Sequence, residues 1–88
     1  MDKGYRVVFE KNAIKQLSKI DKSQKVMLYS YIEKTLQGTE NPRMLGSSLK
    51  GTLKSYWRYR IGDYRIIADI NDSEIVIIVI EVGHRKEI

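Results

Sequence analysis

Four arginines and a histidine in the last third of the sequence are the residues best suited to bind phosphate groups and to move protons near them. An arginine guanidinium stays charged at neutral pH and can hold one phosphate through two parallel hydrogen bonds. Histidine is the residue type that exchanges protons near neutral pH. The candidates are Arg58, Arg60, Arg65, His84 and Arg85. Their recurrence along this third of the chain favours a polyanionic partner.

The charge of the whole chain agrees with such a partner. The chain carries 16 lysines and arginines against 11 acidic residues, which gives a formal net charge of +5. An excess of this kind favours binding to nucleic acid, to a membrane surface or to an acidic protein. It does not choose among the three.

Length, cysteine content and apolar runs exclude several classes of protein. With 88 residues the chain has room for one domain, residues 1–88, with a modest core. The absence of cysteine excludes a disulfide framework, and a single histidine argues further against a structural zinc site. The N-terminus lacks the apolar core of a secretory signal, and the longest apolar run, Ile75–Ile80, is too short to span a bilayer. We therefore expect a soluble, cytoplasmic protein.

The first half of the chain predicts one strand followed by two helices. Residues 5–9 (YRVVF) are rich in β-branched and aromatic side chains, as in a strand. Apolar residues then follow helical spacing from Lys11, which predicts a first helix. Asp21 is a suitable N-terminal cap for a second helix, and Gly38 is placed to end it. The short join between the helices predicts an antiparallel hairpin.

The second half predicts a loop and then a sheet. Residues 38–52 contain Gly, Pro, Ser, Asn and Thr without a sustained period, which is typical of a loop. Residues 56–61 and 64–70 alternate in polarity and are joined by Gly62-Asp63, the composition of a tight hairpin turn. After a second turn, residues 75–82 are almost wholly apolar, as in a strand covered on both faces. The predicted class is α+β, with two helices on one face of a three-strand antiparallel meander.

Alternation also predicts where side chains of this sheet point. Arg58 and Arg60 lie two residues apart and should share one face. Trp57 and Tyr59 should share the other face and pack under the helices, although aromatic rings can also stack on bases.

The ordered set of motifs in this chain resembles the RelE/ParE superfamily of toxins from bacterial and archaeal toxin–antitoxin systems. The motifs are Leu49-Lys50-Gly51, the block from Trp57 to Arg65 (WRYRIGDYR), and the segment from Val82 to Lys86 (VGHRK). The resemblance covers the whole chain. It implies a sandwich similar to that of a compact microbial ribonuclease.

The two branches of the superfamily differ in activity. RelE-like members cleave mRNA in the ribosomal A site without a metal or cofactor, and a small antitoxin neutralises them. ParE-like members poison DNA gyrase and generally lack the cationic active site. The cations of this chain favour the RelE-like branch, a ribosome-dependent endoribonuclease. A gyrase inhibitor without enzymatic activity and a basic RNA-binding module without catalysis are the alternatives.

The resemblance also implies roles for individual residues. Arg85 matches a phosphate clamp that stabilises the transition state, and Arg65 matches an arginine that orients the nucleotide. Arg58 and Arg60 match a basic pair beside the scissile phosphate. His84 is either a general acid or base or a surface contact next to Arg85. The expected RNA-binding lysines are Lys50, Lys54 and Lys86.

Plainer interpretations of the same residues stay open. Arg65 can pair with Asp63 or Asp69, and Arg58 and Arg60 can form a solvated strand face. Tyrosines of the second helix (Tyr29 and Tyr31) fit the core or a partner surface, and the lysines of residues 11–25 fit a solvated face or ribosomal RNA. Many RelE-like toxins place a tyrosine directly after the position of Ile88, where this sequence stops. The resemblance therefore predicts a shortened form or a member that works without that tyrosine.

The expected partners follow from the same resemblance. A basic groove and a small core favour a cognate antitoxin of the RelB-like kind, which would be acidic and amphipathic. mRNA and the ribosome are the expected substrate and site of action. Operator DNA is expected to be bound only through the antitoxin, and no membrane partner is expected.

Overall fold

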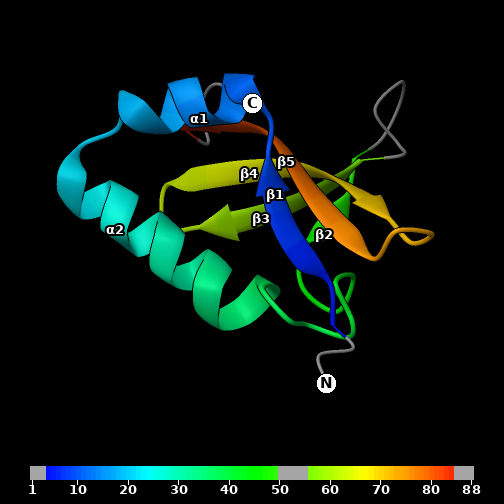
Figure 1. The fold of residues 1–88 in the computed structure, drawn as a ribbon. Coiled ribbons are helices and arrows are strands. Elements are labelled where there is room, and N and C mark those ends of the chain that lie inside the picture. The colour runs from blue at the N-terminus through cyan, green and yellow to red at the C-terminus, as the bar shows by residue number, and fades with distance from the viewer. Residues whose placement is uncertain (1–3, 50–55, 85–88) are drawn as a thin grey trace.

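A five-stranded sheet with two helices on one of its faces is the frame of the protein (Figure 1). The computed structural model describes residues 4–49 and 56–84. In chain order the elements are β1 (Arg6–Phe9), α1 (Lys11–Ser18), α2 (Lys22–Tyr31), η1 (Ile32–Leu36), β2 (Ser47–Ser48), β3 (Trp57–Ile61), β4 (Tyr64–Asn71) and β5 (Val76–His84).

The order of strands across the sheet is β1-β5-β4-β3-β2. The meander of β3, β4 and β5 is antiparallel, as predicted, and the α+β class is confirmed. Two features were not predicted. β1 pairs in parallel with β5, so that the sheet is mixed, and Ser47–Ser48 forms a short edge strand within the segment expected to be a loop.

The helices reverse direction, as expected for a hairpin, but they diverge after the turn (Figure 1). α1 packs mainly on β5, whereas α2 contacts β3 and η1 contacts β1. The turn that directly follows α2, η1, is a π-helix, in which the Gln37 amide donates to the carbonyl oxygen of Ile32 at 2.8 Å. Gly38 then leaves the helix with a φ of 84°, a conformation that favours glycine, as predicted.

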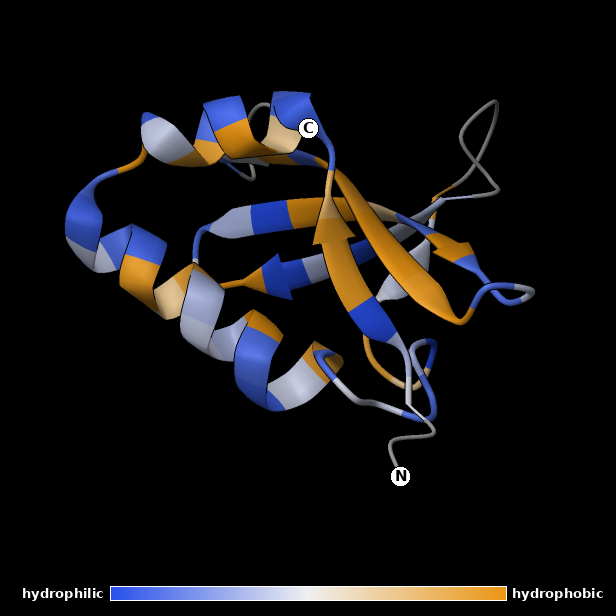
Figure 2. Cartoon of the chain, viewed as in Figure 1, coloured by the Kyte–Doolittle hydropathy of each residue, from blue (hydrophilic) through white to orange (hydrophobic). Residues whose placement is uncertain are grey.

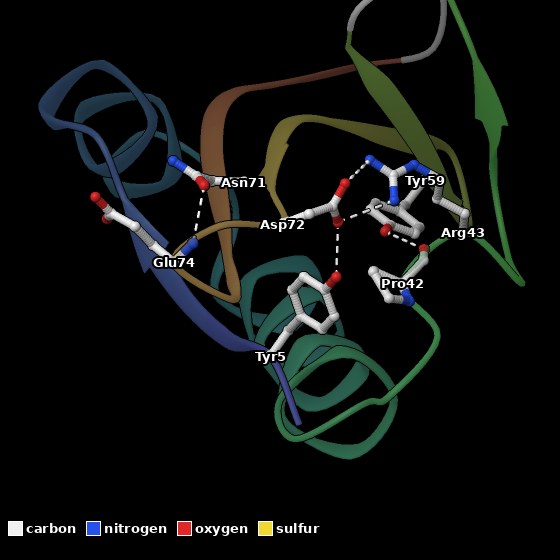
Figure 3. A network of polar contacts seen from close by, with 7 residues as sticks. All are labelled: Tyr5, Pro42, Arg43, Tyr59, Asn71, Asp72 and Glu74. Atoms are coloured by element: carbon white, nitrogen blue, oxygen red, sulfur yellow. Dashed lines mark hydrogen bonds and ion pairs between the residues drawn. The ribbon is translucent and has the colours of Figure 1, made fainter. Parts of the chain in front are cut away.

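The core lies between the helices and the sheet (Figure 2). Its largest fully buried side chains are those of Leu17, Leu28, Leu36, Tyr59, Ile66, Ile77, Val79 and Val82. The prediction that Tyr59 and Trp57 pack under the helices is confirmed, because Tyr59 is fully buried and Trp57 packs against the core. Burial also raises the pKa of the Tyr59 hydroxyl, which donates to the Pro42 carbonyl oxygen (Figure 3).

Beyond Val79, side-chain amides of α1 take the place of β1 as hydrogen-bond partners of the β5 backbone. β1 pairs with β5 only from Val76 to Val79. Beyond that point, Gln16 Oε1 accepts a hydrogen bond from the Val82 amide at 2.6 Å, and Asn12 Nδ2 donates to the carbonyl oxygen of Ile80 at 3.4 Å. Because buried backbone groups need partners, these two amides fix the C-terminal part of β5.

An ion pair joins distant segments at the other end of the sheet (Figure 3). Both terminal nitrogens of Arg43 lie 3.1 Å from the carboxylate oxygens of Asp72, and the Tyr5 hydroxyl donates to the same carboxylate at 2.6 Å. The hydrogen bonds from Arg43 and Tyr5 hold the pKa of Asp72 below its usual value. This cluster ties the start of β1 and the loop before β2 to the β4–β5 turn.

Candidate functional site

The register of the β3–β4 hairpin brings two of the predicted arginines side by side. Arg60 is the direct partner of Arg65, and Arg58 lies two residues before Arg60 on the same strand. Tyr59 and Ile61 point into the core under the helices, so the side chains of Arg58 and Arg60 point to the opposite face. The three arginines therefore share the sheet face that the helices do not cover, here called the arginine face.

A glycine turn sets this register. Gly62 has a φ of 58°, which glycine adopts without steric cost, and Gly62-Asp63 joins β3 to β4 as a two-residue turn. Ile61 pairs with Tyr64 directly across the turn. A shift by one residue would turn every side chain of the strand to the other face, so this turn is what places Arg65 beside Arg60.

Arg58 is held by the edge strand. Its Nη2 lies 3.2 Å from the hydroxyl oxygen of Ser47, the residue of β2 that pairs with it. The Trp57 indole nitrogen donates to the carbonyl oxygen of Leu45 at 2.6 Å and fixes the approach to β2. Gly46 makes this approach possible, because an added Cβ would lie 2.3 Å from the carbonyl oxygen of Arg58. Ser47 was missed in the sequence because a two-residue strand leaves no periodic pattern.

His84 lies on the other face of β5. It pairs with Tyr64 across the strands, and the two rings meet edge to face, with centroids 5.5 Å apart and planes at 73°. Both rings line a hollow of about 330 Å³ at the end of α1, together with residues that include Gln16 and Lys19. The structure thus groups Arg58, Arg60 and Arg65, and places His84 on the helix side of the sheet.

Four predicted site residues lie outside the described part of the chain. They are Lys50, Lys54, Arg85 and Lys86. Their roles remain predictions. Within residues 4–49 and 56–84 no group of three or more His, Cys, Asp or Glu residues could hold a metal ion.

A second surface feature lies on the outer side of α2. A groove of about 670 Å³ is lined by Ile20, Lys22, Lys25, Val26, Tyr29, Ser30, Glu33 and Lys34. Its apolar residues are unusually exposed, with 59% of Val26 and 42% of Tyr29 accessible. The Tyr29 ring rests against Phe9 at 6.0 Å between centroids. Of the two tyrosines of α2, Tyr31 therefore packs against the core and Tyr29 is available to a partner.

None of the described helices is long and apolar enough to cross a membrane.

Comparison with solved structures places this arrangement among known folds. The toxin–antitoxin complex RelBE2 of Mycobacterium tuberculosis contains a chain that matches with a TM-score of 0.84 and 24% identity, over 93% of this chain and 99% of that one. A chain of the archaeal RelE–RelB complex from Pyrococcus horikoshii matches over the full length of both chains, with a TM-score of 0.67 and 25% identity.

Comparison of sequences gives the family. A RelE-like toxin protein of Escherichia coli is 26% identical over 83 residues, which is 93% of this chain and 84% of that protein. The model of the family described as "ParE toxin of type II toxin-antitoxin system, parDE" matches residues 7–88. The chain therefore belongs to the ParE toxin family of type II toxin–antitoxin systems, within the RelE/ParE superfamily.

Proposed function

We propose that this toxin is a ribosome-dependent endoribonuclease that cleaves mRNA in the A site and is neutralised by a cognate antitoxin. One observation carries the proposal. Arg60 and Arg65 are direct cross-strand partners on the sheet face that the helices do not cover, with Arg58 next to them on β3. Three guanidinium groups on one face suit the negatively charged backbone of RNA.

The chemistry assigned to these residues is stabilisation of charge. In RNA cleavage the 2′-hydroxyl attacks the adjacent phosphorus, negative charge grows on the phosphate oxygens, and the 5′-oxygen leaves. Preorganised cations near those oxygens lower the barrier, because they meet charge that develops in the transition state. Arginine does this well, but its pKa above ~12 makes it a poor proton acceptor. The arginine face therefore accounts for binding and charge, and the proton must go elsewhere.

Ser47 takes part in the proposal as a positioning residue. Its hydroxyl oxygen lies 3.2 Å from Nη2 of Arg58 and restrains the end of that long side chain. Restraint of this kind reduces the entropy lost when the guanidinium meets a phosphate. In the proposed mechanism, the Arg58 guanidinium is therefore already positioned to bind a phosphate before the RNA binds.

A gyrase inhibitor is the second candidate, because the family model that matches residues 7–88 is that of ParE toxins. Two assays with the same purified protein separate the candidates. Primer extension on a reporter mRNA in a purified translation system detects cleavage, and supercoiling of a relaxed plasmid by gyrase detects inhibition. The proposal expects cleavage that requires ribosomes and leaves supercoiling intact. Supercoiling defects with intact mRNA would replace it by the gyrase candidate.

The proposed antitoxin contact uses the groove on α2. Lys22, Lys25 and Lys34 surround its apolar floor, and Glu33 is the acidic residue among its lining. An apolar strip bordered by cations fits an amphipathic helix that carries acidic side chains on its flanks. The groove lies on the helix side of the sheet, so a helix bound there leaves the arginine face uncovered. The rest of the antitoxin would have to reach around the domain to block it.

One substitution tests this contact. Val26→Asp places a carboxylate in the groove and should weaken binding of the cognate antitoxin by at least about tenfold, from lost apolar contact and added repulsion. Ile14→Asp is the matched control, because Ile14 is an apolar residue of α1 that is 53% exposed and outside the groove. Titration calorimetry measures both. Equal affinities for the two variants would remove α2 from the interface.

A further inference from the structure

A bulge in β5 brings an acidic side chain to the arginine face. The side chains of Ile77, Val79 and Val82 all belong to the core under the helices. Along β5 the core-facing residues are therefore two positions apart from Ile77 to Val79, but three positions apart from Val79 to Val82. The register shows the cause, because Ile67 of β4 pairs with Glu81 while the residue after Ile67 pairs with Val79. One extra residue is inserted at this point.

The inserted residue decides where Glu81 points. Without it, strict alternation from Val79 would turn Glu81 into the core. With it, Glu81 shares the face of its partner Ile67, which alternates with the core residue Ile66. Arg65 lies on that same face, diagonal to Glu81, at the roughly 7–8 Å spacing that long side chains can span.

α1 holds the bulge in place. The Ile80 carbonyl oxygen, within the bulge, accepts from Asn12, and the Val82 amide just after it donates to Gln16. These bonds lie on the edge of β5 that β1 does not reach. The bulge is thus a fixed feature of the fold, of the kind that re-aims side chains next to active sites.

We propose that Glu81 is the general base of the cleavage reaction, an inference that rests on the proposed ribonuclease function. The Glu81 carboxylate takes the proton of the 2′-hydroxyl as the bond from the 2′-oxygen to phosphorus forms. The bond from phosphorus to the 5′-oxygen then breaks, and that oxygen takes a proton from water. The products are a 2′,3′-cyclic phosphate and a free 5′-hydroxyl.

The surroundings of Glu81 suit this role. Its side chain is half-buried, and within residues 4–49 and 56–84 its carboxylate has no ion-pair partner. The charged groups that share its face are Arg58 and Arg60 from β3 and Arg65 and Asp69 from β4. The arginines attract the phosphate to the face that carries this carboxylate, and a carboxylate within reach of the 2′-hydroxyl can accept its proton.

The test is the rate of ribosome-programmed mRNA cleavage, measured over a range of toxin concentrations up to saturation. Glu81→Gln keeps the size of the side chain and removes the base. We expect its maximal rate to fall by about 10²–10⁴-fold with little change in the concentration of toxin that gives half-maximal rate. Glu81→Asp should retain part of the rate.

Two references make the result decisive. Glu74→Gln removes an exposed carboxylate from the β4–β5 turn and should cleave at the natural rate. Arg65→Ala should be inactive if the arginine face is the site. A natural maximal rate in Glu81→Gln, together with an inactive Arg65→Ala, would overturn the inference and leave the ribonuclease function standing. Failure of the natural chain to cleave would overturn both. Binding of the cognate antitoxin by Glu81→Gln verifies that this variant is folded.

Discussion

Loss of the Gln16 side-chain oxygen should destabilise the protein through a single backbone group. Gln16 Oε1 accepts the Val82 amide hydrogen at 2.6 Å in a partly buried position. In Gln16→Leu the side chain keeps its apolar contacts but leaves this N–H without its acceptor. An unsatisfied buried donor costs about 1–3 kcal/mol. For a domain of this size, that loss lowers Tm by roughly 5–20 °C, since 1 kcal/mol shifts Tm by roughly 4–8 °C.

Two further variants show whether the hydrogen bond is the cause. Gln16→Glu retains an acceptor oxygen and should lose much less stability than Gln16→Leu. Gln37→Leu removes a similar bond, in which the Val7 amide donates to Gln37 Oε1 at 2.9 Å, but at an exposed position. Water can replace that acceptor, so we expect a loss below about 0.5 kcal/mol.

Thermal and urea denaturation, followed by circular dichroism, measure all three variants. The expected order of free energies of unfolding places Gln37→Leu nearest to the natural chain, followed by Gln16→Glu and then Gln16→Leu. Equal stability of Gln16→Leu and Gln37→Leu would refute the reasoning. It would mean that the Gln16 side chain does not stabilise the backbone N–H of Val82, and the bulge would lack this support from α1.

Two other predictions concern the far end of the sheet. Because Arg43 and Tyr5 hold the pKa of Asp72 below its unfolded value of about 3.8, its contribution to stability is present above that pH and is lost as pH falls through the lower folded pKa. The stability difference between the natural chain and Asp72→Asn, measured by urea denaturation from pH 7 to pH 2, should therefore shrink at the acid end; a constant difference would contradict the pairing. Tyr59→Phe removes the hydroxyl that donates to the Pro42 carbonyl oxygen, and it should lower the free energy of unfolding by about 0.5–1.5 kcal/mol. An unchanged midpoint of urea denaturation would mean that this hydrogen bond contributes nothing to stability.

The sequence carried enough information for the β3–β4 hairpin and for the face of its arginines. Alternation over residues 56–61 and the Gly62-Asp63 turn each indicated the same register, and the structure pairs Arg60 with Arg65 accordingly. Burial of Tyr59 follows from the same alternation. Local pattern and turn chemistry agree here, and such agreement makes a prediction reliable.

The bulge in β5 could not be predicted from the sequence. Residues 75–80 are apolar at every position, so both faces of the strand look alike and an inserted residue leaves no break in the pattern. The faces of Glu81 and His84 depend on that insertion. Asn12 and Gln16, four residues apart on α1, were a possible signal, because polar amides at that spacing share one helix face. Their partners on β5 become evident only in three dimensions.

The proposed function requires that the arginine face cleaves mRNA on the ribosome. The most direct measurement maps the 5′ ends of a reporter mRNA by primer extension in a purified translation system. The natural chain, Arg65→Ala and Arg6→Ala are compared, where Arg6 is an exposed arginine on β1 that serves as the charge-matched control. We predict cuts within translated codons for the natural chain and for Arg6→Ala, none without ribosomes, and none with Arg65→Ala. Cleavage by Arg65→Ala at the natural rate would contradict the account.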